Sequence, residues 1–422
     1  MISIKSNSST ENAFLVGAIY GSLTRKKVNE HLDELSLLSE TAGANIVHYY
    51  VQRLNKINPA FFIGPGKAKQ IIEHAKSLNV SLVIFDDELS PAQIKNFSNL
   101  SKSVKVIDRS SLILEIFSLH AKTKEAKTQV ELAQLEYLLP RLTRAWTHLE
   151  RQMGGIGTRA GAGETQIEVD RRLVRTRISN LKKELSKIDM EKETQRKKRH
   201  KEYKIALAGY TNAGKSTLMK CLTGSNVLIE DQLFATLDTT IRKIKLGKNH
   251  TALLSDTVGF IRKLPHHLVA SFKSTLQEVV EADLALVTLD ASSEAINDHY
   301  ETILKVLKDI GANDNHILIL NKIDKIKDES RFNLLKKKFP NAIYISAKNS
   351  LRIDALKRDI VKKIDNEFKT IELDLPYEKP KQIAYCQKNV DVLKRDYMDS
   401  HMYLKIRGPA KQINKIKAML NK

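Results

Sequence analysis

The stretch of sequence that decides the fold is Gly209-Tyr-Thr-Asn-Ala-Gly-Lys-Ser-Thr217. It follows an apolar run at 204–208 that predicts a strand, and it precedes residues with helical periodicity, which is the context of a phosphate loop. Its glycines allow backbone N–H groups to surround phosphates, and the following helix adds the positive end of its dipole. We expect Lys215 to reach the terminal phosphates and Ser216 to coordinate Mg²⁺. The candidate nucleotide contacts here are Gly209, Tyr210, Thr211, Asn212, Ala213, Gly214, Lys215, Ser216 and Thr217.

Three later motifs each follow an apolar run and complete the pattern of a GTP-selective site. The first offers a carboxylate for the Mg²⁺ shell and a glycine N–H for the γ-phosphate. The second ends in an aspartate that accepts two N–H bonds from guanine, a paired donor edge that adenine lacks. The third offers the N–H of Ala347 to the guanine oxygen. In chain order the motifs are Asp256, Thr257, Val258 and Gly259, then Asn321, Lys322, Ile323 and Asp324, then Ser346, Ala347 and Lys348.

The segment between the phosphate loop and Asp256 is where a switch should offer a hydroxyl to Mg²⁺ and the γ-phosphate. We favour Thr236 for this role, so that Ser216 and Thr236 are the predicted Mg²⁺ ligands. Thr239 and Thr240 stay open, because spacing alone does not separate them from Thr236. The segment is Phe234, Ala235, Thr236, Leu237 and Asp238.

The residue after Gly259 is Phe260, at the position where Ras-like proteins carry the glutamine that orients the attacking water. The sequence therefore names no catalytic side chain. We expect slow hydrolysis by the chain alone, with the water positioned by the backbone, for example that of Gly259, by another residue or by a partner.

Apolar runs alternate with helical patterns in two regions, and this alternation predicts α/β folds. An N-terminal α/β domain with a mostly parallel sheet is expected at 1–108, and a doubly wound P-loop GTPase domain at 203–368. A small C-terminal α+β domain is expected at 369–422. The predicted strands are 14–20, 45–51, 81–85 and 104–107 in the first domain and 204–208, 251–254, 284–289, 317–320 and 342–345 in the second.

Residues 109–202 become helical on both sides of a glycine-rich break at 153–163. They predict an antiparallel helical hairpin with a flexible tip, in which Pro140 kinks the first helix. A membrane-surface helix is the competing interpretation, but the apolar stripe is narrow and lacks interfacial aromatics. Apolar residues step by three and four along two seams, Leu135, Leu138, Leu142, Ala145 and Leu149, and Ile178, Leu181, Leu185 and Ile188.

The chain is strongly basic, because 70 Lys and Arg against 49 Asp and Glu give a net charge of +21. Such a charge favours a polyanionic partner, with nucleic acid first. Residues 171–204 alone hold fourteen Lys and Arg against five Asp and Glu, although a solvated helix face explains them equally well. Two distant cysteines, no export signal and no apolar stretch of 18 residues predict a cytoplasmic protein without a membrane span.

Together with these motifs, the tract at 154–178 indicates the protein family. It reads Gly154-Gly-Ile-Gly-Thr-Arg-Ala-Gly-Ala-Gly-Glu-Thr-Gln-Ile-Glu-Val-Asp-Arg-Arg-Leu-Val-Arg-Thr-Arg-Ile178, and with it the chain resembles the HflX family of ribosome-associated GTPases. The likeness covers almost the whole chain and includes Gly64-Pro-Gly-Lys67, Gln134-Leu-Glu-Tyr-Leu-Leu-Pro-Arg141 and the GTPase motifs. One departure is Arg159-Ala-Gly-Ala-Gly-Glu164, which lacks the proline of the family's tip and is one residue longer.

The resemblance implies binding to the large ribosomal subunit, with the hairpin tip near the peptidyl-transferase region, and the splitting of stalled ribosomes, notably after heat stress. Arginines beside the tip suit phosphate and stacked-base contacts in rRNA. The alternative is that Glu164, Glu168 and Asp170 pair with those arginines within one helix. The predicted rRNA contacts are Gly157, Arg159, Arg171, Arg172, Arg175 and Arg177.

The sequence leaves a second nucleotide site, a potassium ligand and two rival functions open. The run Gly64-Pro-Gly-Lys67 is a candidate for a second nucleotide, ATP, as proposed for family members, but a turn and a helix start explain it equally well. Asn212 permits a potassium ligand. A tRNA-modification GTPase is the rival enzyme, although its case lacks a cysteine near the chain end, since Cys386 is the last one. A non-ribosomal RNA-binding or membrane-recruited switch is the rival of another class. We expect a monomer.

Overall fold

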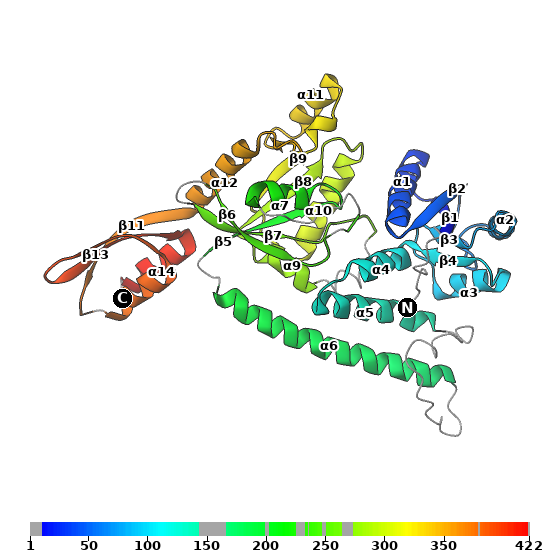
Figure 1. The fold of residues 1–422 in the computed structure, drawn as a ribbon, viewed down its shortest axis with the longest axis horizontal. Helices are drawn as coiled ribbons and strands as arrows, with labels where there is room; N and C mark the ends of the chain where they lie inside the picture. Colours follow the sequence, from blue (N-terminus) through cyan, green and yellow to red (C-terminus); the bar gives the residue numbers. More distant parts are fainter. Residues whose placement is uncertain are drawn as a thin grey trace.

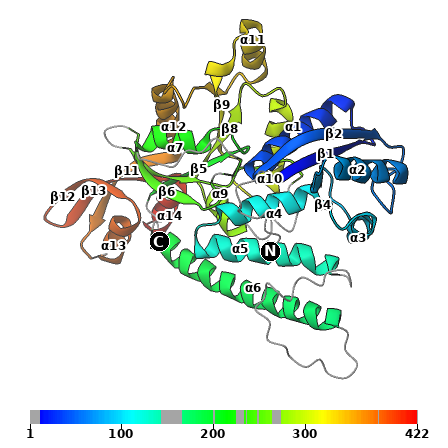
Figure 2. The same ribbon diagram turned by 45° about the vertical axis from the view of Figure 1, so that its right-hand side comes forward.

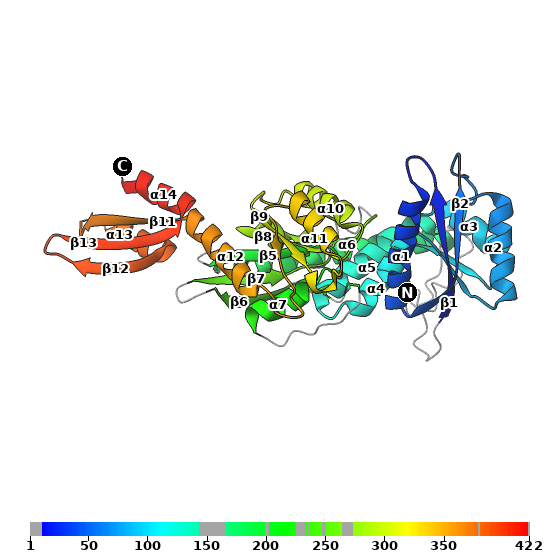
Figure 3. The same cartoon turned by 90° about the horizontal axis from the view of Figure 1, so that it is seen from above.

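The computed structural model describes residues 11–142, 166–198, 202–224, 233–234, 236–246, 250–263, 273–378 and 380–420. The chain forms a four-stranded, a six-stranded and a three-stranded sheet in sequence order (Figure 1). Seen from above in Figure 3, the N-terminal and C-terminal sheets lie at opposite ends of the molecule, with the six-stranded sheet between them. The predicted fold classes are confirmed. Within the described ranges, no helix is long and apolar enough to cross a membrane.

The N-terminal sheet is parallel and has the order β2-β1-β3-β4. Side chains alternate along β1, so that Ala13 and Leu15 pack with α1 and α4, whereas Phe14 and Val16 pack with α2 and α3. All four strands predicted here form, with ends shifted by a few residues. The bounds are β1 Glu11–Ile19, α1 Arg25–Thr41, β2 Ala44–Arg53, α2 Pro65–Ser77, β3 Leu82–Phe85, α3 Pro91–Leu100, β4 Lys105–Asp108 and α4 Arg109–His120.

A helical hairpin follows, made of α5 Lys124–Leu138, the 3-10 turn η1 Leu139–Arg141 and α6 Gln166–Lys198. Helices α5 and α6 lie side by side (Figure 2). Their shared apolar seam contains Leu135, Ile178 and Leu181, as the spacing predicts.

Pro140 does more than kink the first helix. Helix α5 ends at Leu138 and the chain continues as a 3-10 turn, because proline lacks the N–H of an i to i−4 hydrogen bond and its ring crowds the preceding turn. Leu142 still joins the seam after this break. Ala145, Leu149 and the glycine-rich tip lie outside the described residues.

The central sheet has the order β10-β9-β8-β5-β7-β6 and is parallel except for β6. Strand β6 Thr240–Lys245 is an antiparallel edge strand that the sequence did not predict, because Arg242, Lys243 and Lys245 interrupt its apolar pattern, as is common on exposed edges. The other elements are β5 Tyr203–Gly209, α7 Lys215–Thr223, β7 Thr251–Asp256, α9 Lys273–Val280, β8 Leu284–Asp290, α10 Ile296–Asp309, β9 His316–Asn321, η3 Ile323–Lys325, α11 Glu329–Lys338, β10 Ile343–Tyr344 and α12 Ile353–Glu367.

The C-terminal unit is a three-stranded antiparallel sheet of order β11-β13-β12. Helices α13 and α14 cover one face of it through a separate small core that contains Leu404, Ile406, Ile413 and Ile416. This is the small α+β fold predicted for the end of the chain. The bounds are β11 Phe368–Pro376, α13 Pro380–Asn389, β12 Asp391–Tyr397, β13 His401–Pro409 and α14 Ala410–Leu420.

Candidate functional site

The phosphate loop runs from the end of β5 to the start of α7, at the carboxyl edge of the central sheet. Geometry requires two of its glycines. A Cβ on Gly209 would lie 2.4 Å from the carbonyl oxygen of Thr288, and Gly214 has a φ of 87°, which L side chains rarely adopt. The loop therefore has the tight backbone path that phosphate binding needs.

Lys215 is buried at the base of this loop. Its ammonium group donates hydrogen bonds to the carbonyl oxygens of Gly209 at 3.1 Å and Tyr210 at 2.9 Å. Burial lowers the pKa of Lys215 to about 8, against the opposing effect of the Asp256 carboxylate. A phosphate brought to the loop would supply further negative charge and favour the protonated amine.

Three side-chain oxygens meet beside the loop. Ser216 Oγ lies 2.8 Å from both Thr236 Oγ1 and Asp256 Oδ2, and Thr236 Oγ1 lies 3.3 Å from the same carboxylate oxygen. Asp256 Oδ1 is buried without a hydrogen-bond partner among the described residues, and burial raises the pKa of this carboxyl group. Hydroxyl and carboxylate oxygens are the ligands that Mg²⁺ prefers, so the three residues fit that ion. Thr236 makes these contacts, whereas Thr240 begins β6.

The segment after β7 lies against the phosphate loop. Thr211 N donates to the carbonyl oxygen of Phe260 at 2.7 Å, and Phe260 N donates to that of Gly209 at 3.0 Å. Gly259 is so close that a Cβ on it would lie 2.7 Å from Thr211 Cα. Phe260 is 3% exposed and packs into the hydrophobic core, and its phenyl ring has no polar group to offer a water molecule.

Asn321, in the motif after β9, forms hydrogen bonds with both the phosphate loop and the motif that contains Ala347. Asn321 Nδ2 donates to the carbonyl oxygen of Ala213 at 2.9 Å, and Asn321 Oδ1 accepts from the N–H of Ala347 at 2.9 Å. The sequence predicts that the N–H of Ala347 contacts the guanine oxygen. In this structure the N–H of Ala347 instead donates to the side-chain oxygen of Asn321, a residue that is 2% exposed.

Lys322 is held from two sides. Its Nζ lies 2.9 Å from Asp290 Oδ2 and 3.4 Å from the side-chain oxygen of Asn212 in the phosphate loop. Asp290 ends β8 directly beside Asn321 in the ladder. No motif indicates Asp290, because only the pairing of β8 with β9 brings it to Lys322.

A cavity of about 480 Å³ opens between these motifs, within the size range of small-ligand sites. Three residues that no motif indicates also line it: Lys220, Lys325 and the half-buried Cys221. The predicted contacts on the wall are Thr211, Asn212, Gly214, Lys215, Ser216, Thr217, Phe234, Thr236, Thr257, Gly259, Asn321, Lys322, Asp324, Ala347 and Lys348.

Some predicted contacts lie behind this wall. Leu237 and Val258 point into the hydrophobic core, and the side chains of Tyr210 and Asp238 turn toward the N-terminal half of the chain. Ala235 lies outside the described residues. The others that are not on the wall are Gly209, Ala213, Asp256, Ile323 and Ser346.

Comparison of the sequence with known proteins gives the family of this chain. Residues 29–118, 120–199 and 204–322 match the families described as GTP-binding GTPase N-terminal, GTP-binding GTPase Middle Region and 50S ribosome-binding GTPase. The GTPase HflX of Escherichia coli is 40% identical over 405 residues, which cover 94% of this chain and 94% of the relative. This chain belongs to the HflX family of GTPases. It is therefore a GTP hydrolase, as the motifs predict.

One further HflX relative and one solved structure are also similar to this chain. The GTPase HflX of Flavobacterium psychrophilum is 50% identical over 318 residues, 75% of this chain and 76% of the relative. A GTP-binding protein from the hyperthermophilic archaeon Sulfolobus solfataricus, solved in complex with GDP, is 26% identical with a TM-score of 0.45. That likeness covers 83% of this chain and 98% of the archaeal chain.

In this HflX-family chain, two of the candidate rRNA arginines stabilise the hairpin. Arg171 Nη2 donates to the carbonyl oxygen of Leu142 at 3.1 Å, and Arg177 forms a bidentate pair with Glu131 of α5 at 2.7 and 2.8 Å. The alternative of pairing within one helix therefore does not describe Arg177, whose partner lies across the hairpin. Arg172 and Arg175 are exposed on α6, and Gly157 and Arg159 lie outside the described residues.

The run Gly64-Pro-Gly-Lys67 begins α2. The N–H of Gly64 is already bonded to Gln52 Oε1 at 3.0 Å. Lys67 Nζ donates to Gln70 Oε1 at 3.1 Å and lies 5.0 Å from the centre of the Tyr50 ring. This is the geometry of a helix start.

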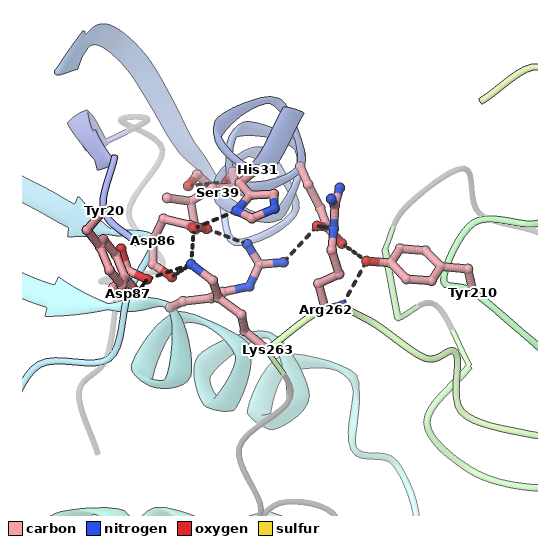
Figure 4. Close-up of polar contacts among 11 residues, drawn as sticks. Tyr20, His31, Ser39, Asp86, Asp87, Tyr210, Arg262 and Lys263 are labelled. Atoms are coloured by element: carbon pink, nitrogen blue, oxygen red, sulfur yellow. Dashed lines mark hydrogen bonds and ion pairs between the residues drawn. The ribbon is translucent and has the colours of Figure 1, made fainter. Parts of the chain in front are cut away.

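A further set of polar residues joins the phosphate loop to the N-terminal domain, and the sequence gives no sign of it. Figure 4 shows Tyr210 of the loop and Arg262 and Lys263 of the segment after Gly259 facing the N-terminal domain. The partners Tyr210 and Glu34 are 176 positions apart. No periodicity or spacing in a single sequence links residues across such a distance.

Proposed function

We propose that this HflX-family GTPase binds the large ribosomal subunit in its GTP-bound form and splits stalled ribosomes into subunits, notably after heat stress. GTP-bound order in the switch segments would hold the ribosome-engaging conformation, and hydrolysis would release it. The single observation that carries the proposal is a GTPase site joined in one chain to a basic helical hairpin. The family matched by residues 204–322, described as 50S ribosome-binding GTPase, supports the choice of partner.

In this proposal each motif has a defined role at the nucleotide. Asp324 would accept N–H bonds from guanine, and Lys215 would contact the terminal phosphates. Ser216 and Thr236 would coordinate Mg²⁺, and the carboxylate of Asp256 would add negative charge beside them. The ion, when bound, neutralises charge on the phosphates.

Hydrolysis by the isolated chain is proposed to be slow and to be stimulated by the ribosome. The supporting observation is Phe260, whose buried ring takes the place of a water-orienting glutamine. The N–H of Gly259 would meet the γ-phosphate, and a group supplied by the partner would orient the water.

The hairpin is the proposed contact with rRNA. Arg172 and Arg175 are exposed and suited to phosphate contacts, while Gly157 and Arg159 would act from the tip. Arg171 and Arg177 would contribute mainly by holding α6 in place. The tip would approach the peptidyl-transferase region.

The remaining parts of the proposal concern the whole chain. We place domain boundaries after residues 108, 202 and 368, and we expect a monomer that works in the cytoplasm with ribosomes. A second nucleotide, ATP, at the N-terminal domain stays a prediction, and Lys67 beside the Tyr50 ring is the place to look for it.

Turnover of GTP in the presence of intact ribosomes, isolated large subunits or bulk RNA tests this proposal. We expect strong stimulation by ribosomes and large subunits and little by bulk RNA. Equal stimulation by bulk RNA would favour a non-ribosomal RNA-binding switch, and no stimulation by any of them would favour a tRNA-modification enzyme. The variant Lys215→Ala, which loses the phosphate contact, provides the background rate.

A further inference from the structure

Switch I, defined here as residues 233–234 and 236–240, is held from outside the GTPase domain. The carboxylate of Asp238 accepts two hydrogen bonds from Thr123, one from its hydroxyl at 2.5 Å and one from its backbone N–H at 3.3 Å. Thr123 is the N-cap of α5, and its hydroxyl also accepts from Ala126 N at 3.1 Å. Thr123 therefore both caps the first helix of the hairpin and binds Asp238 of switch I.

The other end of switch I is fixed by an aromatic contact. The ring of Phe234 meets that of Phe117 on α4 edge to face, with centroids 4.7 Å apart and planes at 86°. Both side chains are almost fully buried. Phe234 N also donates to Thr211 Oγ1 in the phosphate loop at 3.0 Å.

The backbone of Phe234 needs such support. Its φ is 59°, in the left-handed region that non-glycine residues adopt only at a cost in free energy. A conformation of this kind persists where surrounding contacts determine it, and here those contacts include Phe117 of the N-terminal half.

Thr236 lies midway between the two anchors. It is two residues after Phe234 and two before Asp238, and Leu237 beside it is buried. Its hydroxyl is already 2.8 Å from Ser216 Oγ and 3.3 Å from Asp256 Oδ2. The oxygens suited to Mg²⁺ are thus assembled while the segment that carries Thr236 is fixed on both sides.

We propose that Thr123 and Phe117 are positioning residues for GTP hydrolysis, which hold switch I so that Thr236 stands at the Mg²⁺ site. The inference rests on the proposed role of Thr236 as a Mg²⁺ ligand and is independent of the ribosome. Neither residue lines the nucleotide cavity. Thr123 acts through Asp238, and Phe117 acts through Phe234. Their effect is to reduce the ordering that Mg²⁺ and GTP must otherwise impose on the switch.

The decisive variant is Thr123→Asp. Aspartate keeps the N-cap of α5 but has no hydroxyl donor, and it places a second carboxylate beside Asp238. Thr123→Ser retains both the cap and the donor. The matched control is Thr24→Asp, the same substitution at the N-cap of α1, where Thr24 accepts from Lys27 N.

Two measurements are needed. The first is the Mg²⁺ concentration at half-maximal binding of a fluorescent, non-hydrolysable GTP analogue, which we expect to rise about tenfold in Thr123→Asp. The second is hydrogen exchange of residues 236–240 in protein free of nucleotide and metal, which we expect to become faster. Thr123→Ser and Thr24→Asp should match the wild type in both, and Phe117→Leu should weaken protection of switch I.

The outcomes separate the inference from the role assigned to Thr236. If Thr236→Ala raises the Mg²⁺ requirement but Thr123→Asp changes neither measurement, the inference about Thr123 is wrong. If Thr236→Ala leaves the Mg²⁺ requirement unchanged, the assignment of the ligand is wrong, whereas altered exchange in Thr123→Asp still supports the anchoring of switch I.

Discussion

The hydroxyl of Tyr210 in the phosphate loop donates a hydrogen bond to the carboxylate of Glu34 on α1. The same hydroxyl accepts from the backbone N–H of Arg262 at 2.8 Å, and the Arg262 side chain reaches Glu34 at 3.1 Å. The phosphate loop, the segment after Gly259 and the N-terminal domain thus meet at one phenol (Figure 4). The Tyr210 ring also stacks on His299 with centroids 3.8 Å apart.

Behind this contact lies a buried guanidinium group. Arg109, which is 2% exposed, pairs with Glu34 at 3.0 Å and with Asp86 at 2.7 Å. Burial alone would raise the pKa of Glu34, but Arg109, then Arg262 and the Tyr210 hydroxyl, lower it overall. Lys263 adds ion pairs to Asp86 and Asp87 at 2.5 and 2.6 Å. The contact between the N-terminal domain and the GTPase domain is therefore a network of buried ion pairs, and removing one charge leaves its partners without compensation.

Removing Glu34 should destabilise the protein strongly. Glu34→Ala leaves Arg109 buried with Asp86 as its remaining ion-pair partner, and breaking a buried pair from one side costs about 3–5 kcal/mol. Chemical denaturation of Glu34→Ala should show this loss in the free energy of unfolding. Asp33→Ala, at an exposed position on the same helix, should change it by less than about 0.5 kcal/mol. Equal stability of the two variants would mean that the interface contributes little.

Asp290 should support nucleotide binding without contacting the reacting phosphates. Asp290→Ala frees Lys322, which the ion pair at 2.9 Å holds beside Asn212 of the phosphate loop. We expect about tenfold weaker binding of both GTP and GDP, equivalent to ~1.4 kcal/mol, with little change in kcat. Asp309→Asn, exposed at the end of α10, is the control. A loss confined to GTP, or to kcat, would contradict this role.

The nucleotide motifs could be predicted from the sequence because each of them is local. The run from Gly209 to Thr217 contains its own glycines, lysine and hydroxyl, and the strand before it can be recognised from its apolar residues. Thr236 could not be separated from Thr239 and Thr240 in the sequence, since only packing of the switch against Ser216 and Asp256 distinguishes them.

The contacts that join the parts of the chain could not be predicted. Glu34 reads as an ordinary polar residue of an amphipathic helix, and Thr123 as a helix cap. Their partners Tyr210 and Asp238 are brought to them by the placement of the N-terminal domain on the GTPase domain, for which a single sequence carries no periodic or spacing signal. Strand β6 was missed for another reason, because its charged edge lacks an apolar run.

The lowered pKa of Lys215 predicts that GTP binding depends on pH. The free site holds this lysine with a pKa of about 8, and bound phosphates favour its protonated form. Binding should therefore take up a proton above pH 8, and affinity should fall as pH rises, about fourfold between pH 7 and 8.5. Calorimetry in buffers of different ionisation enthalpy would measure the proton uptake. If the affinity for GTP did not change across this pH range, the lowered pKa of Lys215 would be contradicted. In Lys215→Arg the affinity should no longer depend on pH.

The exposed arginines of α6 should be needed for ribosome binding. The double variant Arg172→Glu, Arg175→Glu reverses two charges, and we expect at least a tenfold loss in co-sedimentation with large subunits at unchanged GTP affinity. Arg25→Glu with Arg358→Glu, both exposed on other helices, is the control for net charge. If both double variants lost binding equally, general basicity rather than the hairpin would explain it.

Light scattering of intact ribosomes mixed with the protein tests the central claim most directly. With GTP or a non-hydrolysable analogue, we predict a fall in scattering as ribosomes separate into subunits, and with GDP or the Lys215→Ala variant we predict none. Arg172→Glu, Arg175→Glu should slow the fall. Ribosomes that remain intact with GTP-bound protein, although it sediments with large subunits, would show that this GTPase binds ribosomes without splitting them.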